Sequence, residues 1–574
     1  MYNQQHKSRS IIVFFSCIFI FFILGVRIFY LQVFQNKFYK NLAASQHTSR
    51  VRVEPHRGDI LDRRGRKIAT SILTTSVYVH PKKISDVKKV SRILSEKLDI
   101  KEDVLKSRIT SDKNFVWIKR KTDTQTGDSI RALKIEGLGV REERKRVYPT
   151  SELFSIVGYS DIDNKGIEGL EKHWDSLLSG SRGFEYYSVD ARGRRFKALP
   201  DKNIDVKNGL EVVLSLDAIY QNIAYEALKK AVLQTGAKRG FIITGFPKTG
   251  EIITFVRYPS FDPNTPFSLS AESKRNFPVT DIFEPGSSFK VVTASAAIEE
   301  EIVELQDRFY CEQGIYNIGR FRLRDHKPFG WLTFKEVIEQ SSNIGTAKIA
   351  MMLGPDKLYK YIDGFGFGKK TGIDMPGEVR GLIRPVSKWS KTSEWCIPMG
   401  QEVGVTGIQL YSMISTIANG GYWVQPYITD YFQSNDGGVR WMPKRLPARR
   451  VISERTAGLM EEILTGVVER GTGFRAKIPG VLVAGKTGTA QKIGADGRYS
   501  ADKFIASFVG YVKTDDISIA GVVVIDEPQT SPFGSVVAAP VFKEVCQKIL
   551  AYMVDESLQE TSTTIAQLRS RALR

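Results

Sequence analysis

An uninterrupted apolar segment stands out near the N-terminus of the chain. Residues 11–26 read IIVFFSCIFIFFILGV without a charge, and apart from Arg27, which can snorkel to the interface, the apolar character continues to Leu31. A helix over 11–31 would be about 31 Å long, close to the thickness of the hydrocarbon core of a bilayer. We therefore predict a transmembrane anchor over 11–31, preceded by a short cytoplasmic tail over 1–10. The alternative is a cleaved signal peptide, but its apolar region would be shorter, with small residues following closely.

After the anchor, the hydrophobic pattern changes near residue 205. Residues 32–205 contain short strand-like pieces such as TSVYVHP and NFVWIKRK, basic turns and few long apolar runs. From 206 the apolar residues recur with the regular spacings of strands and amphipathic helices. The pattern indicates one domain over 32–205, a second over 206–556 and a tail over 557–574. The composition of the last fifteen or so residues is the closest in the chain to that of a disordered segment.

The second domain predicts a sheet with helices packed against it. The expected strands are 209–217, 239–246, 251–259, 502–512 and 517–528, and the expected helices are 218–237 and one near 539–553. Two of these strands flank the turn PKTG and form a hairpin. Hairpin strands combined with helices in this way predict an α+β fold.

The length, hydrophobic content and net charge of the chain limit the classes of protein to which it can belong. A chain of 574 residues with 42% hydrophobic content is too long for one core and suits two or three domains. The net charge of +20 fits an ordinary basic surface or contact with an anionic membrane or wall outside the cell. Nucleic acid is a third possibility, but the chain has no zinc-ligand spacing and no signature of a nucleic-acid-binding module, so we expect no nucleic-acid partner.

The four cysteines do not indicate a metal site, because no C-x-x-C pair occurs. One of them, Cys17, lies in the apolar N-terminal segment. The other three are Cys311, Cys396 and Cys546, which can form at most one disulfide; we expect unpaired buried thiols. No metal and no cofactor are predicted.

Residues 284–290, EPGSSFK, place a hydroxyl and an amine three positions apart before the apolar run VVTASAAI. If a helix begins near Ser287, the side chains of Ser287 and Lys290 share one face. A serine nucleophile needs a base, and burial lowers the pKa of a lysine towards neutrality. Gly286 permits a sharp turn and leaves room for substrate. Ser288 is the alternative nucleophile, but Val291 stands three positions after it. A capping serine is the simpler explanation of S-x-x-K alone.

A second candidate element lies in the segment TFKEVIEQSSNIG, 333–345. Thr333 and Glu336 form a capping box that starts a short helix, and this helix ends at the loop containing Ser341 and Asn343. We expect Ser341 to relay a proton and Asn343 to bind an amide. Taken alone, S-x-N is also compatible with simple loop chemistry.

The tripeptide K-T-G occurs three times, at 248–250, 370–372 and 486–488. The first copy reads as a hairpin turn, and the second follows a glycine-rich stretch. The third follows GVLVAG and reads as a strand, so we select Lys486, Thr487 and Gly488, with the N–H of Thr489 offered to an oxyanion. Lys486 and the hydroxyl groups would bind a substrate carboxylate.

The trio S-x-x-K, S-x-N and K-T-G, in this order, resembles that of penicillin-binding proteins and β-lactamases. Together with RGDILDRRG (57–65), RVYP (146–149), 166–183, 249–264 and 400–410, the chain resembles a class B penicillin-binding protein over nearly its whole length. The phrases FEPGSSFKVVT and VVVIDEP are closer to division-specific (FtsI-type) members than to elongation-specific ones. No region of glycosyltransferase size precedes the first domain, which argues against a bifunctional class A member.

The resemblance implies a membrane-anchored D,D-transpeptidase with an elongated non-catalytic pedestal domain. Ser287 would attack the donor stem peptide with Lys290 as base, and the N–H groups of Ser287 and Thr489 would hold the oxyanion. Ser341, near Lys486, would protonate the leaving D-alanine. The implied partners are peptidoglycan stem peptides, β-lactam antibiotics, the membrane, a glycan polymerase and division proteins. The basic residues that flank the anchor would by themselves predict the opposite orientation, because more of them follow the anchor than precede it. The wall chemistry nevertheless implies that most of the chain lies outside the bacterial cytoplasmic membrane.

Other hypotheses for the function are compatible with the same motifs. An elongation-specific transpeptidase would share the motifs. A D,D-carboxypeptidase or a β-lactamase would also share them but needs a dedicated base for water, which the sequence does not reveal. A penicillin-binding sensor or scaffold is the non-enzymatic alternative, although a sensor is expected to have a larger cytoplasmic part.

Overall fold

The computed structural model describes residues 2–46, 48–190, 194–266, 270, 274–319, 321–438, 440–494 and 497–572. The chain divides into two compact units. The first comprises Met1–His56 and Ser179–Gly209, and the second comprises Arg57–Leu178 and Leu210–Arg574. This division differs from the predicted boundary at 205/206, because strands from 57–178 share a sheet with strands from the second half of the chain.

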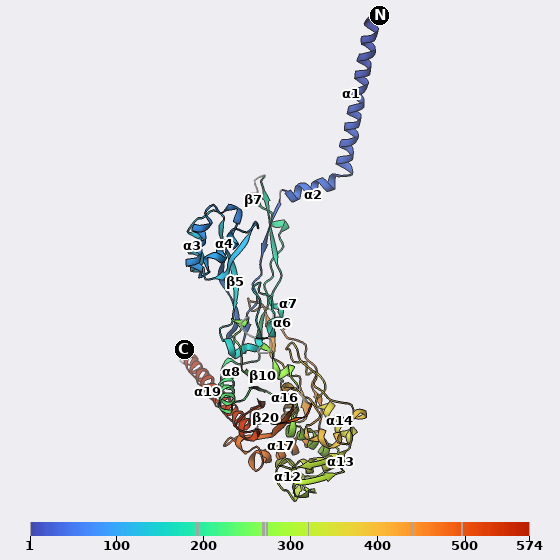
Figure 1. The fold of residues 1–574 in the computed structure, drawn as a ribbon, viewed down its shortest axis with the longest axis vertical. Coiled ribbons are helices and arrows are strands. Elements are labelled where there is room, and N and C mark those ends of the chain that lie inside the picture. Colours follow the sequence, from blue (N-terminus) through green and yellow to red (C-terminus); the bar gives the residue numbers. More distant parts are fainter. Residues whose placement is uncertain are drawn as a thin grey trace. The chain divides into compact units, whose positions relative to one another are not determined.

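The first unit begins with the long helix α1 (Tyr2–Val33), followed by α2 (Asn36–Gln46) (Figure 1). Residues Lys7–Val33 of α1 are long and apolar enough to cross a membrane, and they are not buried against any other part of the protein. A three-stranded antiparallel sheet in the order β1-β6-β7 completes the unit, with bounds β1 (Thr48–Val53), β6 (Gly183–Val189) and β7 (Arg195–Ala198). The predicted apolar N-terminal helix is therefore present.

The second unit contains a mixed sheet that joins distant segments. Its strand order is β17-β16-β8-β2-β3-β4, and β5 also pairs with β3. The bounds are β2 (Ile60–Leu61), β3 (Lys67–Val79), β4 (Val116–Thr122), β5 (Leu138–Val147), β8 (Glu211–Leu214), β16 (Thr429–Gln433) and β17 (Arg440–Trp441). Next to β3 and β4 lie α3 (Val87–Leu98), α4 (Glu102–Ile109) and α5 (Thr124–Arg131), which enclose a small separate core.

Buried ion pairs hold the first charged motif, 57–65, in place. Arg57 Nε donates to Glu171 Oε2 at 2.8 Å, and Arg146 Nε donates to Glu171 Oε1 at 2.6 Å. The three side chains are almost completely buried. Burial of an unpaired charge is costly, so each partner depends on the others. The first part of the motif, through Asp62, is therefore part of the core, whereas residues 63–65 form an exposed turn.

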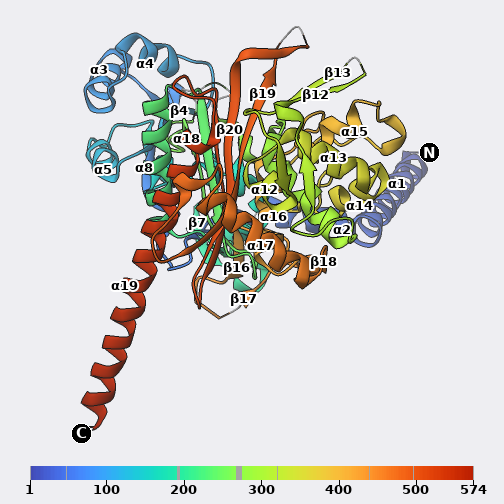
Figure 2. The same cartoon turned by 90° about the horizontal axis from the view of Figure 1, so that it is seen from below.

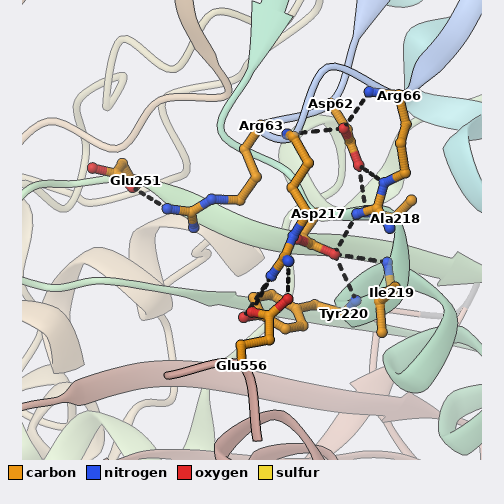
Figure 3. Close-up of polar contacts among 10 residues, drawn as sticks. Asp62, Arg63, Arg66, Asp217, Ala218, Ile219, Tyr220, Glu251 and Glu556 are labelled. Carbon is orange, nitrogen blue, oxygen red and sulfur yellow. Dashed lines mark hydrogen bonds and ion pairs between the residues drawn. The ribbon is translucent and has the colours of Figure 1, made fainter. Parts of the chain in front are cut away.

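The turn after β2 is tied to the start of helix α8 (Ala218–Thr235) (Figure 3). Arg66 bridges two carboxylates, with 2.6 Å from Nε to Asp62 Oδ2 and 2.9 Å from Nη2 to Asp217 Oδ1. Asp217 also caps α8 by accepting from the N–H of Ile219 at 2.8 Å. Arg64 pairs with both Asp217 and Glu556.

A second sheet of this unit has five antiparallel strands in the order β10-β9-β21-β20-β19. Figure 2 labels β19 and β20 of this sheet. Its bounds are β9 (Arg239–Gly245), β10 (Ile252–Tyr258), β19 (Leu482–Ile493), β20 (Tyr499–Lys513) and β21 (Ser518–Asp526). Alternate residues of β9 and β21 enter two different cores. One core contains α8 and the start of α19 (Ala539–Ala572), and the other contains α11 (Lys290–Glu299) and α16 (Gly407–Ala418).

The remaining elements surround this sheet. They are α6 (Gly169–His173), α7 (Asp175–Leu178), α10 (Phe277–Thr280), β11 (Arg308–Tyr310), β12 (Ile315–Ile318), β13 (Phe321–Arg324), β14 (Trp331–Thr333), α12 (Phe334–Glu339), α13 (Asn343–Leu353), α14 (Pro355–Gly364), α15 (Ser393–Cys396), β15 (Tyr422–Trp423), β18 (Arg449–Arg450), α17 (Glu454–Glu469) and α18 (Gly534–Val537). The predicted α+β fold is confirmed. Helix α19 extends to Ala572, so the segment whose composition was closest to disorder has a helical backbone through that residue.

Candidate active site

Ser287 and Ser288 have different environments although they are neighbours. Both lie in the 3-10 turn η5 (Gly286–Phe289), which runs directly into α11. Ser288 is fully buried, and its hydroxyl donates to the carbonyl of Pro285 at 2.8 Å. Ser287 is partly exposed, and its hydroxyl makes no hydrogen bond within the described part of the chain. Of the two serines, Ser287 is the one available to a substrate.

Lys290 occupies the first position of α11 and is completely buried. Its Nζ donates to the carbonyl of Ser341 at 2.7 Å, to Asn343 Oδ1 at 2.8 Å and to Ser341 Oγ at 3.3 Å. Burial lowers the pKa of Lys290 to about 7, although the nearby charge of Asp325 opposes the shift. A substantial share of this amine is therefore unprotonated at neutral pH, as a general base requires.

The loop with Ser341 and Asn343 is held by local backbone geometry. The capping box of Thr333 and Glu336 starts α12 as predicted, and α12 ends at Glu339. Ser341 then adopts a left-handed backbone conformation with φ of 59°. This conformation, which is uncommon outside glycine, separates α12 from α13 and turns the Ser341 hydroxyl towards Lys290.

Asp325 holds the Ser341–Asn343 loop in place through hydrogen bonds. The sequence motifs did not identify this residue. One of its oxygens accepts from the Ser342 hydroxyl at 2.7 Å, and the other accepts from the backbone N–H groups of Asn343 and Ile344. These N–H groups belong to the first turn of α13, where a carboxylate is favourable. Its only signal in the sequence is an acidic residue in a basic stretch, which is a common pattern.

The third K-T-G copy lies on the edge strand β19, next to η5. A Cβ on Gly488 would lie 2.8 Å from the carbonyl oxygen of Pro285, and one on Gly286 would lie 2.5 Å from that of Thr489. Both glycines are therefore needed for the close approach. Gly286 has φ of +55°, which agrees with the sharp turn predicted at this residue. The space beside Gly286 that we predicted for substrate is instead filled by the backbone of β19. Because the N–H and C=O of one strand residue point to the same edge, the N–H of Thr489 also faces η5.

Lys486 is fully buried beside these groups. Burial lowers its pKa well below the ordinary lysine value, and the charge of Lys290 adds to the effect. The hydroxyl of Thr487 contacts that of Thr472 at 2.9 Å, and the hydroxyl of Thr489 accepts from the N–H of Gly534. The structure thus gathers the eight predicted site residues around η5, the start of α13 and β19.

The other two K-T-G copies lie elsewhere in the fold. Residues 248–250 belong to the turn between β9 and β10. Thr371 lies in a loop after α14, where its hydroxyl donates to Glu378 at 2.6 Å. Neither copy is on a strand beside η5. Residues 85–88 also fit the pattern S-x-x-K, but there Asp86 caps the charged helix α3.

Two domain families match the chain. Residues 240–547 match the penicillin-binding protein transpeptidase domain, and residues 52–214 match the penicillin-binding protein dimerisation domain. The chain belongs to the class B penicillin-binding proteins. It is accordingly a peptidoglycan D,D-transpeptidase, and the resemblance of its motifs to this class is confirmed.

Relatives in this family cover most of the chain. Stage V sporulation protein D of Bacillus subtilis is 34% identical over 559 residues, covering 96% of this chain and 86% of the relative. Peptidoglycan D,D-transpeptidase FtsI of Escherichia coli K12 is 30% identical over 511 residues, covering 87% of this chain and 84% of the relative. Penicillin binding protein 3 of Mycobacterium tuberculosis, solved in complex with aztreonam, has a TM-score of 0.69 and 27% identity and covers 88% of this chain and 97% of that chain.

Proposed function

We propose that this transpeptidase crosslinks stem peptides during septal wall synthesis, with Ser287 as its nucleophile. The observation that carries the site assignment is the buried amine of Lys290, whose pKa is lowered to about 7 and which contacts Ser341 and Asn343. The similarity to FtsI and the phrases FEPGSSFKVVT and VVVIDEP support the septal role.

In the first half-reaction, neutral Lys290 takes the proton of the Ser287 hydroxyl as Oγ attacks the carbonyl carbon between the last two D-alanines of a donor stem. The N–H groups of Ser287 and Thr489 stabilise the oxyanion, each by about 10²–10³ in rate. The peptide C–N bond breaks, and Ser341 passes a proton to the leaving amine with Lys486 beside it. Ser287 then carries an ester to the donor.

In the second half-reaction, an amine of a neighbouring stem attacks this ester and releases Ser287, which regains a proton. Asn343 orients the donor amide. Its Oδ1 accepts from Lys290 and its Nδ2 donates to the carbonyl of Arg324 at 2.8 Å, which leaves one Nδ2 hydrogen for a substrate. β-Lactams would acylate the same serine by resembling the donor.

The location of the substrate determines the membrane orientation that we propose. The stem peptides lie outside the cytoplasm, so α1 would cross the bacterial cytoplasmic membrane once and the second unit would lie on the outer side. A glycan polymerase and division proteins would contact the pedestal domain and α1, since crosslinking requires newly made glycan strands.

Mapping of a penicillin adduct tests the site. The protein is labelled with a fluorescent penicillin and digested, and the modified peptide is sequenced. We expect the label on Ser287, its loss in Ser287→Ala and its retention in the matched control Ser288→Ala. A label on another residue, or labelling of Ser287→Ala at the wild-type rate, would contradict the assignment.

A role in sporulation is the second candidate, because the similarity to Stage V sporulation protein D is 34% over 559 residues. A fluorescent fusion produced from the native locus distinguishes the two roles. Enrichment at midcell in growing cells, with filamentation on depletion, supports the septal role. Production confined to sporulating cells, with normal division on depletion, supports the second candidate.

A further inference from the structure

A cavity of about 730 Å³ lies within the second unit, and none of the proposed catalytic residues lines it. Its walls come from residues within 155–172, 257–280 and 375–377. The first of these segments belongs to the matched dimerisation domain, and the other two belong to the matched transpeptidase domain. Apolar contacts are offered by Ile156, Ile167 and Met375. The remaining lining is unusually rich in cationic groups.

Arg257, on β10, is the deepest of these cations, with 3% of its surface exposed. Its Nη1 donates to the backbone carbonyl of Arg275 at 2.7 Å, and its guanidinium stacks near the rings of Phe261 and Phe277. Nη2 is buried and has no hydrogen-bond partner among the described residues. Glu168 is the carboxylate that attracts Arg257 electrostatically, but no hydrogen bond joins the two side chains in the described part of the chain. Burial lowers the pKa of Arg257 to about 10, so it remains charged at neutral pH.

Asn276 adds unpartnered hydrogen-bonding groups to the same cavity. Both Nδ2 and Oδ1 of this side chain are buried, and neither has a partner within the described segments. A buried amide without a hydrogen-bond partner is destabilising, and so is a buried guanidinium with an unsatisfied N–H group. Two such groups in one cavity point to a ligand that accepts hydrogen bonds from both.

The charges around the cavity have one predominant sign. Lys172 lies exposed at its edge, while Lys274 donates to the carbonyl of Pro266 at 3.2 Å. Arg275 pairs with Asp281 at 2.9 Å. Glu168 is the one acidic residue in the lining, and burial raises its pKa, which favours its neutral form relative to an exposed glutamate.

We propose that this cavity binds an oxyanion group, a phosphate or a carboxylate, that belongs to a larger molecule. The guanidinium of Arg257 and the amide of Asn276 would donate to the anion, and Lys172 would attract it at the entrance. The space exceeds that of a single anion, so the rest of the molecule would contact Ile156, Ile167 and Met375. An acidic stem peptide or a phosphate-bearing wall polymer would carry such a group.

Calorimetric titration of the full-length protein in detergent tests the site. Pyrophosphate and glutarate serve as probes at neutral pH, with chloride at matched ionic strength as the reference. We expect at least one probe to bind tenfold more tightly than chloride. Tighter binding of pyrophosphate assigns the site to phosphate-bearing polymers, and tighter binding of glutarate assigns it to peptide carboxylates.

Variants locate the binding. Asn276→Asp keeps the shape of the side chain but adds a negative charge, and we expect at least a tenfold loss of affinity. Lys172→Ala should weaken binding several-fold, whereas Lys248→Ala removes an exposed lysine of the β9–β10 turn and should change nothing. Penicillin acylation checks the fold of each variant. The proposal is overturned if neither probe exceeds chloride, or if Lys172→Ala and every folded Asn276→Asp sample bind like wild type; neither result would affect the transpeptidase assignment.

Discussion

The lowered pKa of Lys290 predicts how the rate of penicillin acylation depends on pH. An ordinary lysine is neutral to only about 3 parts in 10,000 at pH 7. With its pKa lowered from 10.5 to about 7, about half of Lys290 is neutral at that pH. The gain is about a thousandfold in active base, equivalent to ~4 kcal/mol. We therefore expect the acylation rate to fall about tenfold per pH unit below the bend near pH 7 and to level off above it.

Stopped-flow measurement with a fluorescent penicillin, over a range from about pH 5.5 to about pH 9, follows this dependence directly. Lys290→Arg keeps a cation that does not deprotonate in this range, so its acylation should be slow throughout. Ser288→Ala should reproduce the wild-type profile. A rate that stays constant from pH 6 to pH 9, or a wild-type profile in Lys290→Arg, would refute the assignment of Lys290 as the base.

Four further expectations follow from the packing. Between pH 7 and 10.5 the unfolded chain retains a proton at Lys290 that the folded chain releases, so this residue makes the free energy of unfolding rise with pH, measurable by urea titration. Gly488→Ala should abolish acylation, since its Cβ would overlap neighbouring atoms, whereas Gly458→Ala, with open space around it, should leave acylation unchanged. Glu171→Gln should lower the free energy of unfolding by about 3–5 kcal/mol, seen as a lower midpoint in urea. Asp325→Asn should slow acylation about 10–100-fold by loosening the Ser341–Asn343 loop, and a wild-type rate would contradict this role.

Local patterns in the sequence predicted which residues the structure brings together at the candidate site. Ser287 and Lys290 are three positions apart at a helix start, and the strand character of 482–493 distinguished the third K-T-G copy from the other two. The capping box at Thr333 was equally local. These features depend on residues close together in the chain, so their spacing carries the information.

Features that depend on long-range contacts were not predicted. Asp325 acts on a loop that follows it by more than ten residues, and no motif links the two segments. The ion pairs of Glu171 with Arg57 and Arg146 likewise join separate parts of the chain. The shared sheet also joins segments from both sides of the predicted boundary at 205/206, because β8 pairs with β2 across a long insertion.

The pairing of β2 with β8, and of β8 with β16, has a consequence for synthesis of the protein. Ile60 leaves the ribosome early, but its sheet is complete only after Trp441 has been made. Contacts between such distant residues form slowly because long loops must close first. We therefore expect the nascent pedestal segment to stay partly folded until more than half of the transpeptidase domain has been synthesised. During that time its apolar strand edges are exposed and prone to aggregation.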